Sequence, residues 1–284
     1  MRWQGRRGSR NIEDRRGMRM SGGGGIGLVG ILFILGMGWF FGIDVTPLLT
    51  GTGGGGGEVV QTDAPLTEAD RREGEFVSVT LADTEEVWAG IFEEQINEPY
   101  TPATLVLFKE VTQSPCGNAS GATGPFYCPG DRKVYLDTQF FTTMRDRLGA
   151  GGDFAAAYVV AHEVAHSVQD QLGILGEANR IRGQVSQEEA NAISVRIELQ
   201  ADCYSGIWAQ QAQEKFGSLE RGDIEEAMNA AAQIGDDTLQ RNAGQRPMPE
   251  SFTHGTSEQR QRWFQTGFET GDLEACDTFG TNDI

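Results

Sequence analysis

The segment VVAHEVAHSVQD, residues 159–170, contains two of the three histidines in this 284-residue chain. His162 and His166 are four residues apart, so on a helix both rings lie on one face and can bind one metal ion. Glu163 lies beside that face, where a carboxylate can take a proton from a zinc-bound water. The spacing predicts a zinc (Zn²⁺) hydrolase centre. The alternative is a core helix with two structural histidines, whose unsatisfied rings would cost free energy.

A catalytic zinc ion usually has three protein ligands, so one more is required. The short pattern HExxHxxGxxH is absent, because Gln169 and Leu172 occupy the positions of its glycine and third histidine. The segment IELQADC instead places Glu198 and Asp202 four residues apart, on one face of a helix and among apolar residues. We predict that Glu198 is the third ligand and that Asp202 accepts a hydrogen bond from a ligand histidine. A solvated acidic helix face is the alternative.

Two long predicted helices must position these side chains. The first covers 153–173 and is apolar on nearly every side, as expected of a buried helix. The second covers 186–217, with Ser186 and Glu189 in capping-box spacing at its start. The remaining expected elements are helices at 82–96, 138–149, 223–234 and 256–271 and strands at 104–111 and 133–137. The sequence therefore predicts a mostly helical α+β domain with a small sheet.

The N-terminal part divides into blocks of different composition. Residues 1–25 are Arg-rich, 26–43 form an uncharged apolar run long enough for a transmembrane helix, and 44–65 form a Gly-rich linker before a domain at 66–284. Seven arginines precede the apolar run, which predicts a single-pass anchor with a cytoplasmic N-terminus and the domain periplasmic or extracellular. A cleaved signal peptide is the alternative, but no small-x-small cleavage site lies near the end of the run.

Charge and cysteine content agree with a domain outside the cytoplasm. The net charge is -18, with the acidic residues concentrated after residue 57, and this argues against a nucleic-acid partner. All four cysteines follow the apolar run, so disulfides are expected, with three pairings possible. The Gly-rich loop between Cys116 and Cys128 favours a disulfide there, which leaves Cys203 with Cys276. Free buried thiols are the alternative.

Several motifs together resemble a known family. The combination HExxH plus ExxxD is similar to the gluzincin class of zinc peptidases. The more specific segments are RRGSRNIEDRRG, CGNASGATGPFYCPGDRKVYLD, ELQADCYSGIWA and SFTHGTSEQRQRWF. Over nearly the whole chain they resemble the bacterial neutral zinc metallopeptidases (YpfJ-like). The resemblance implies a zincin-like metalloprotease domain on a membrane anchor, zinc bound by His162, His166 and Glu198, Glu163 as the catalytic residue, and a peptide or protein substrate.

Two further roles are hypotheses. His254 precedes a capped helix, where gluzincins often supply a donor to the developing oxyanion, although a loop histidine without a role fits equally. Arg260, one turn into that helix, could support the same region or be solvated. The strand at 133–137 could be the edge along which a peptide lies, or an interior strand.

The rival function is a cell-envelope binding or scaffold protein with a structural or vestigial zinc site.

Overall fold

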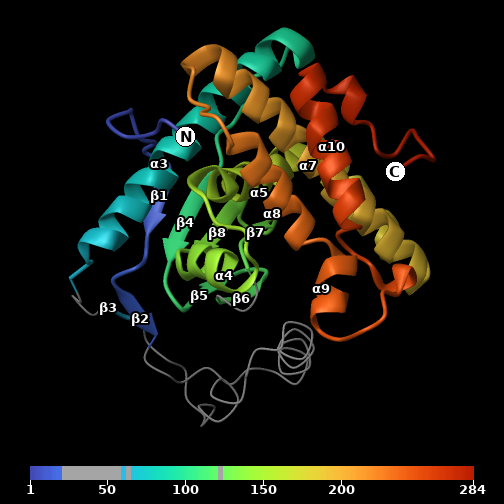
Figure 1. Ribbon diagram of the computed structural model, residues 1–284, viewed down its shortest axis with the longest axis horizontal. Coiled ribbons are helices and arrows are strands. Elements are labelled where there is room, and N and C mark those ends of the chain that lie inside the picture. The colour runs from blue at the N-terminus through green and yellow to red at the C-terminus, as the bar shows by residue number, and fades with distance from the viewer. Residues whose placement is uncertain (21–58, 62–64, 121–123) are drawn as a thin grey trace.

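The computed structural model describes residues 1–20, 59–61, 65–120 and 124–284, which form the predicted mostly helical α+β fold (Figure 1). Its main sheet has the order β1-β4-β8-β7. The strands are β1 (Ile12–Asp14), β4 (Thr104–Phe108), β8 (Lys133–Asp137) and β7 (Phe126–Cys128). The first three are parallel and β7 is antiparallel to β8. Interior strands of such a sheet are covered on both faces, which explains the nearly continuous burial of β4 and β8.

Helices of very different length surround this sheet. They are α3 (Glu68–Ile91), α4 (Gln139–Arg147), α5 (Asp153–Gln171), α6 (Ile174–Arg182), α7 (Gln187–Phe216), α8 (Asp223–Gln233), α9 (Asp236–Asn242) and α10 (Ser257–Thr270). The smaller elements are two strand pairs, β2 (Met18–Met20) with β3 (Val59–Gln61) and β5 (Val111–Ser114) with β6 (Gly117–Ser120), and the short turns η1 (Phe92–Ile96), η2 (Pro249–Ser251) and η3 (Glu274–Cys276). The predictions of α4, α5, α7, α8 and α10 are confirmed, whereas α6 and α9 were not predicted.

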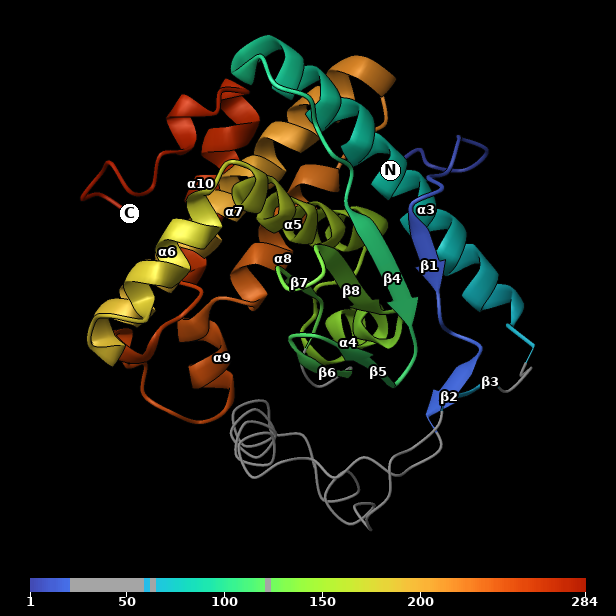
Figure 2. The same cartoon turned by 180° about the vertical axis from the view of Figure 1, so that it is seen from behind.

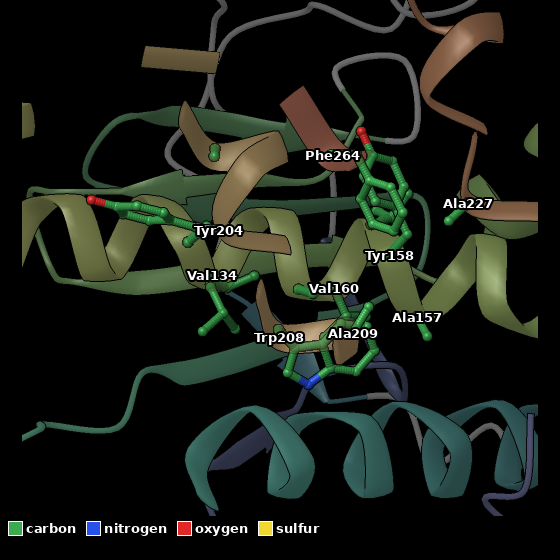
Figure 3. Close-up of a cluster of buried hydrophobic side chains, with 14 of the residues drawn as sticks. Val134, Ala157, Tyr158, Val160, Tyr204, Trp208, Ala209, Ala227 and Phe264 are labelled. Carbon is green, nitrogen blue, oxygen red and sulfur yellow. The ribbon is translucent and has the colours of Figure 1, made fainter. Parts of the chain in front are cut away.

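Helix α5 lies in the centre of the core. Every residue from Phe154 to Ala165 is buried. Val160 of α5 belongs to one hydrophobic cluster with Val134 of β8 and Trp208 of α7 (Figure 3), and α5 contacts both the sheet and α7. A helix enclosed in this way cannot rotate about its axis, and the side chains that it directs at α7 are held in place.

Helices α7 and α10 cross at unusually close range (Figures 1 and 2). A Cβ atom on Gly206 would lie 2.0 Å from the carbonyl oxygen of Phe264, and one on Gly267 would lie 1.8 Å from that of Cys203. Only glycine permits such an approach between helix backbones. The crossing brings residues near the start of α10 against the middle of α7, next to α5.

The first residues of the chain belong to the same domain. Strand β1 extends the sheet beside β4, with Ile12 opposite Leu105, and the segment before it runs along α3 (Figure 2). Both terminal nitrogens of Arg6 donate to the Asp83 carboxylate at 2.7 Å. The predicted separation of residues 1–25 from the domain is therefore wrong for residues 1–20, because their partners are distant in the sequence and no local pattern indicated them.

Helix α3 is longer than predicted. It begins at Glu68, with Thr67 and Asp70 forming a capping box, rather than at Asp83 or Thr84. Those two residues are buried inside the helix. Residues 59–61 of the expected linker form β3. The apolar run 26–43 lies outside the described residues, and none of the helices within the described ranges is long and apolar enough to cross a membrane.

Both expected disulfides are present. Cys116 is bonded to Cys128, and Cys203 to Cys276. The first joins the end of β7 to a neighbouring loop, and the second joins α7 to the C-terminal turn η3.

The possible role of 133–137 as an edge strand is wrong, because β8 lies between β4 and β7. The edges of the main sheet are β1 and β7.

The docking of the N-terminal segment leads to a first prediction. Arg6→Ala should lower the free energy of unfolding by about 2–4 kcal/mol at pH 8, because it leaves the Asp83 carboxylate buried without its partner. Burial raises the pKa of Asp83 to about 6 even against the opposing effect of Arg6. Without Arg6 the pKa rises further, so the loss is small at pH 5, where the carboxyl takes up a proton, and grows as pH rises through the folded-state pKa.

Arg7→Ala is the matched control for this prediction. Arg7 pairs with Glu86 at the surface, where both side chains are largely exposed, so the expected loss is below about 0.5 kcal/mol. Urea unfolding of the full chain at both pH values measures the difference. Equal, small losses in the two variants would mean that Arg6 and Asp83 do not form a buried pair.

Candidate metal centre

Helices α5 and α7 bring the three predicted ligands together. Possible ligand atoms of His162, His166 and Glu198 all lie within 4.8 Å of one another. Nε2 of His162 is 3.0 Å from one carboxylate oxygen of Glu198, and Nε2 of His166 is 3.6 Å from the other. Two imidazoles and one carboxylate are the donor set of catalytic zinc sites that keep an open position. Among the described residues no fourth His, Cys, Asp or Glu joins this group.

A buried ionic network lies behind His162. Its Nδ1 is 2.9 Å from Oδ1 of Asp202, although their orientation is not that of a hydrogen bond. The guanidinium of Arg260 holds both oxygens of Asp202, at 2.8 and 2.9 Å, and the hydroxyl of Tyr158 donates to Oδ1. Burial raises the pKa of the Asp202 carboxyl, but Arg260 and His162 outweigh it and hold the pKa below its ordinary value. Asp202 is therefore a fixed negative charge beside the ligand histidine.

Protons and a metal ion compete for His162. Burial opposes its charged form, but the carboxylates of Asp202 and Glu198 outweigh burial and raise its pKa to about 10. A metal ligand must present a deprotonated nitrogen, so metal binding at Nε2 displaces a proton. The two carboxylates favour either cation, which is the electrostatic setting expected of a metal centre.

Glu163 lies next to His162 on α5 and is 7% exposed. Burial raises the pKa of its carboxyl, and the nearby His166 and His162 act in the opposite direction. A carboxylate whose pKa is moved toward neutrality can accept a proton and release it again. Glu163 is not part of the three-ligand group, so it is available for this role.

His254 lies on a loop that Asp236 organises. Oδ2 of Asp236 accepts the backbone N–H groups of Thr253, His254 and Gly255, at 2.7, 2.7 and 3.1 Å. Nδ1 of His254 lies 3.3 Å from Oδ1 of the same carboxylate, and the His254 ring is about half exposed. The ring is close enough to Glu198 for their charges to interact. The loop therefore places an accessible imidazole near the ligand group.

The sequence of the chain matches a defined family. Residues 1–279 match the family described as "Putative neutral zinc metallopeptidase". The chain belongs to this family. It is 44% identical to the uncharacterized protein YpfJ of Escherichia coli K12 over an alignment of 292 residues that covers 99% of each chain. It is 45% identical to the uncharacterized protein Rv2575 of Mycobacterium tuberculosis over 195 residues, 65% of each chain. No solved structure matches.

Within this member of the zinc metallopeptidase family, the sequence predicted the three candidate ligands that the structure brings together, but residues around them were missed. Tyr158 precedes His162 by one helical turn and points at Asp202. Asp236 is the first residue of α9, a helix that was not predicted. Gln169 was considered only as a departure from another motif. Its position three residues after His166, on the same face of an apolar helix, is the signal that could have indicated it.

Proposed function

We propose that this protein is a zinc-dependent metallopeptidase in which His162, His166 and Glu198 bind the metal. The observation that carries the proposal is the convergence of these three donors, with Glu163 beside them and no fourth ligand among the described residues. A zinc ion bound there would polarise the scissile carbonyl and lower the pKa of water. The family to which the chain belongs supports the same reaction.

Glu163 is the proton carrier of the proposed reaction. Its carboxylate takes the proton from the attacking water and delivers it to the leaving amine. Burial supports both steps, because it raises the pKa of the carboxyl toward that of a group which can accept and release a proton near neutral pH. Its place on α5, one residue from His162, keeps it at a constant position relative to the ligand group.

His254 is proposed as a donor to the developing oxyanion. Because Nδ1 faces Asp236, Nε2 is the nitrogen available to a substrate.

Arg260 has a different role from the one first considered for it. Its guanidinium is buried and holds Asp202, so it acts on His162 through that carboxylate and does not contact a substrate.

The rival function is a cell-envelope binding or scaffold protein with a structural zinc site. Structural sites normally have four protein ligands. The described residues offer three, and His254 is not part of the group. This count favours the enzyme over the scaffold protein.

We also propose that the domain acts outside the cytoplasm on a peptide or protein substrate. The two disulfides support this location, since disulfides persist in oxidising compartments. The pairing of β1 with β4 supports one location for residues 1–20 and the domain, and we propose this in place of the expected cytoplasmic N-terminus. A single-pass anchor at 26–43 would place residues 1–20 and the domain on opposite sides of the membrane, so our proposal does not include it.

Metal analysis of Glu198→Ala tests the proposed centre. The wild-type chain should bind about one zinc ion, and the variant should bind zinc at least about 100-fold more weakly, because only two ligands remain. Glu188→Ala is the control, since Glu188 is exposed in the first turn of the same helix. Chelator competition measures both affinities. Unchanged affinity in Glu198→Ala would place the third ligand elsewhere.

A further inference from the structure

Two buried glutamines connect His166 to the C-terminal turn. Gln169 of α5 is fully buried and Gln200 of α7 is 4% exposed. Oε1 of Gln169 lies 2.8 Å from Nδ1 of His166. Nε2 of Gln169 donates to the carbonyl oxygen of Ile197 at 2.8 Å and to Oε1 of Gln200 at 3.0 Å. Nε2 of Gln200 donates in turn to the carbonyl of Cys276 at 3.1 Å.

The main chain determines the direction of every bond in this chain of contacts. A carbonyl oxygen can only accept, so the amide nitrogen of Gln169 must face Ile197 and that of Gln200 must face Cys276. The carbonyl oxygen of Gln169 is then the atom that faces His166. An oxygen there accepts a hydrogen bond, so Nδ1 of His166 carries the proton and Nε2 keeps its lone pair.

The structure assigns Gln169 as a positioning residue for His166. It selects the tautomer in which Nε2 is the free nitrogen, and it holds the ring with that nitrogen toward Glu198. The carbonyl of Ile197, one residue before Glu198 on α7, sets the orientation of Gln169. On α7, Glu198 is therefore itself a proposed metal ligand, and its neighbour Ile197 orients Gln169, which in turn holds the ligand His166. This inference rests on the proposed function, because it concerns a ligand of the proposed zinc ion.

The two histidines are supported by different chemistry. Behind His162 stands the charged group of Asp202, Arg260 and Tyr158, whereas behind His166 stands a neutral amide. Partners behind ligand histidines fix tautomer and ring orientation, and their loss typically weakens metal binding about 10–100-fold. A neutral partner orients the ring of His166 without adding a further charge to the buried site.

The test compares two buried Gln→Leu changes in the same network. Gln169→Leu removes the acceptor of His166 and should weaken zinc binding about 10–100-fold. Gln200→Leu also removes a buried amide and one of the two hydrogen bonds that the Cys276 carbonyl accepts, so it should lower the unfolding temperature of the metal-free chain about as much as Gln169→Leu does. In Gln200→Leu the Ile197 carbonyl still orients Gln169, so the zinc affinity of this variant should stay within about threefold of wild type.

Chelator competition on the full chain gives the zinc affinities, and thermal unfolding of metal-free protein gives the stabilities. Wild-type affinity in Gln169→Leu would overturn the assignment. So would parallel losses of zinc affinity in Gln169→Leu and Gln200→Leu, since zinc affinity would then follow stability alone. A wild-type chain that binds no zinc would instead overturn the proposed function, and this assignment with it.

Discussion

Glu163→Gln is expected to lower kcat for peptide cleavage by about 10³–10⁴-fold while zinc binding is unchanged. Glutamine has the shape of glutamate but cannot accept a proton from water at neutral pH. The side chain lies beside the three-ligand group and is not one of its members, so the replacement leaves the metal donors in place. Cleavage of a casein-like substrate, together with zinc analysis of the same sample, measures both quantities.

His254→Ala is the comparison variant for Glu163→Gln. It should also retain zinc, but lose only about 10²–10³-fold in kcat, the usual effect of removing one oxyanion donor. Cleavage by Glu163→Gln at the wild-type rate would remove Glu163 from the mechanism. If Glu163→Gln lost zinc and activity together, the result would show instead that Glu163 is needed to bind the metal.

Arg260→Met is expected to lower the free energy of unfolding by about 3–5 kcal/mol. Arg260 and Asp202 are 2% and 0% exposed, so the variant leaves a carboxylate inside the core without its cation. With Arg260 absent, the pKa of Asp202 rises, and a protonated Asp202 no longer supplies the fixed charge behind His162. Zinc affinity should therefore fall together with stability. Urea unfolding and chelator competition provide the two measurements.

The double variant Arg260→Met with Asp202→Asn separates these two effects. It removes the buried charge and should recover part of the lost stability, but zinc affinity should stay low because His162 still lacks its carboxylate. Arg262→Met is the control, since Arg262 pairs with Asp283 at the surface. Its expected effect is below about 0.5 kcal/mol. A loss of that small size in Arg260→Met would contradict the role given to the buried pair.

The elements that carry the candidate site could be predicted because their signals are local. His162, Glu163 and His166 share one helix, and their spacing alone places both rings on one face. The ends of α7 follow from a capping box at Ser186 and a left-handed glycine at Gly217, and both are confirmed. Glu198 was found through its spacing to Asp202 and its apolar neighbours, which together indicate a buried carboxylate that needs a partner.

The features that were missed depend on contacts between distant parts of the chain. Asp83 looked like a helix cap because its buried partner, Arg6, is 77 residues away. The first turns of α3 were not predicted as helix because they are polar and largely exposed, which is also how a surface helix begins. Asp236 could not be recognised as the organiser of the His254 loop, since only tertiary structure brings the loop to α9. Sequence patterns identify ligands more readily than the residues that hold them.

The most direct measurement is peptide cleavage by the full chain before and after metal removal. Protein stripped with a chelator should lose activity and regain it when about one zinc ion per chain is restored. The Glu163→Gln variant, treated identically, should rebind zinc and stay inactive. Cleavage that persists in metal-free protein, or zinc-loaded wild type that cleaves no faster than Glu163→Gln, would contradict the assignment as a zinc-dependent metallopeptidase.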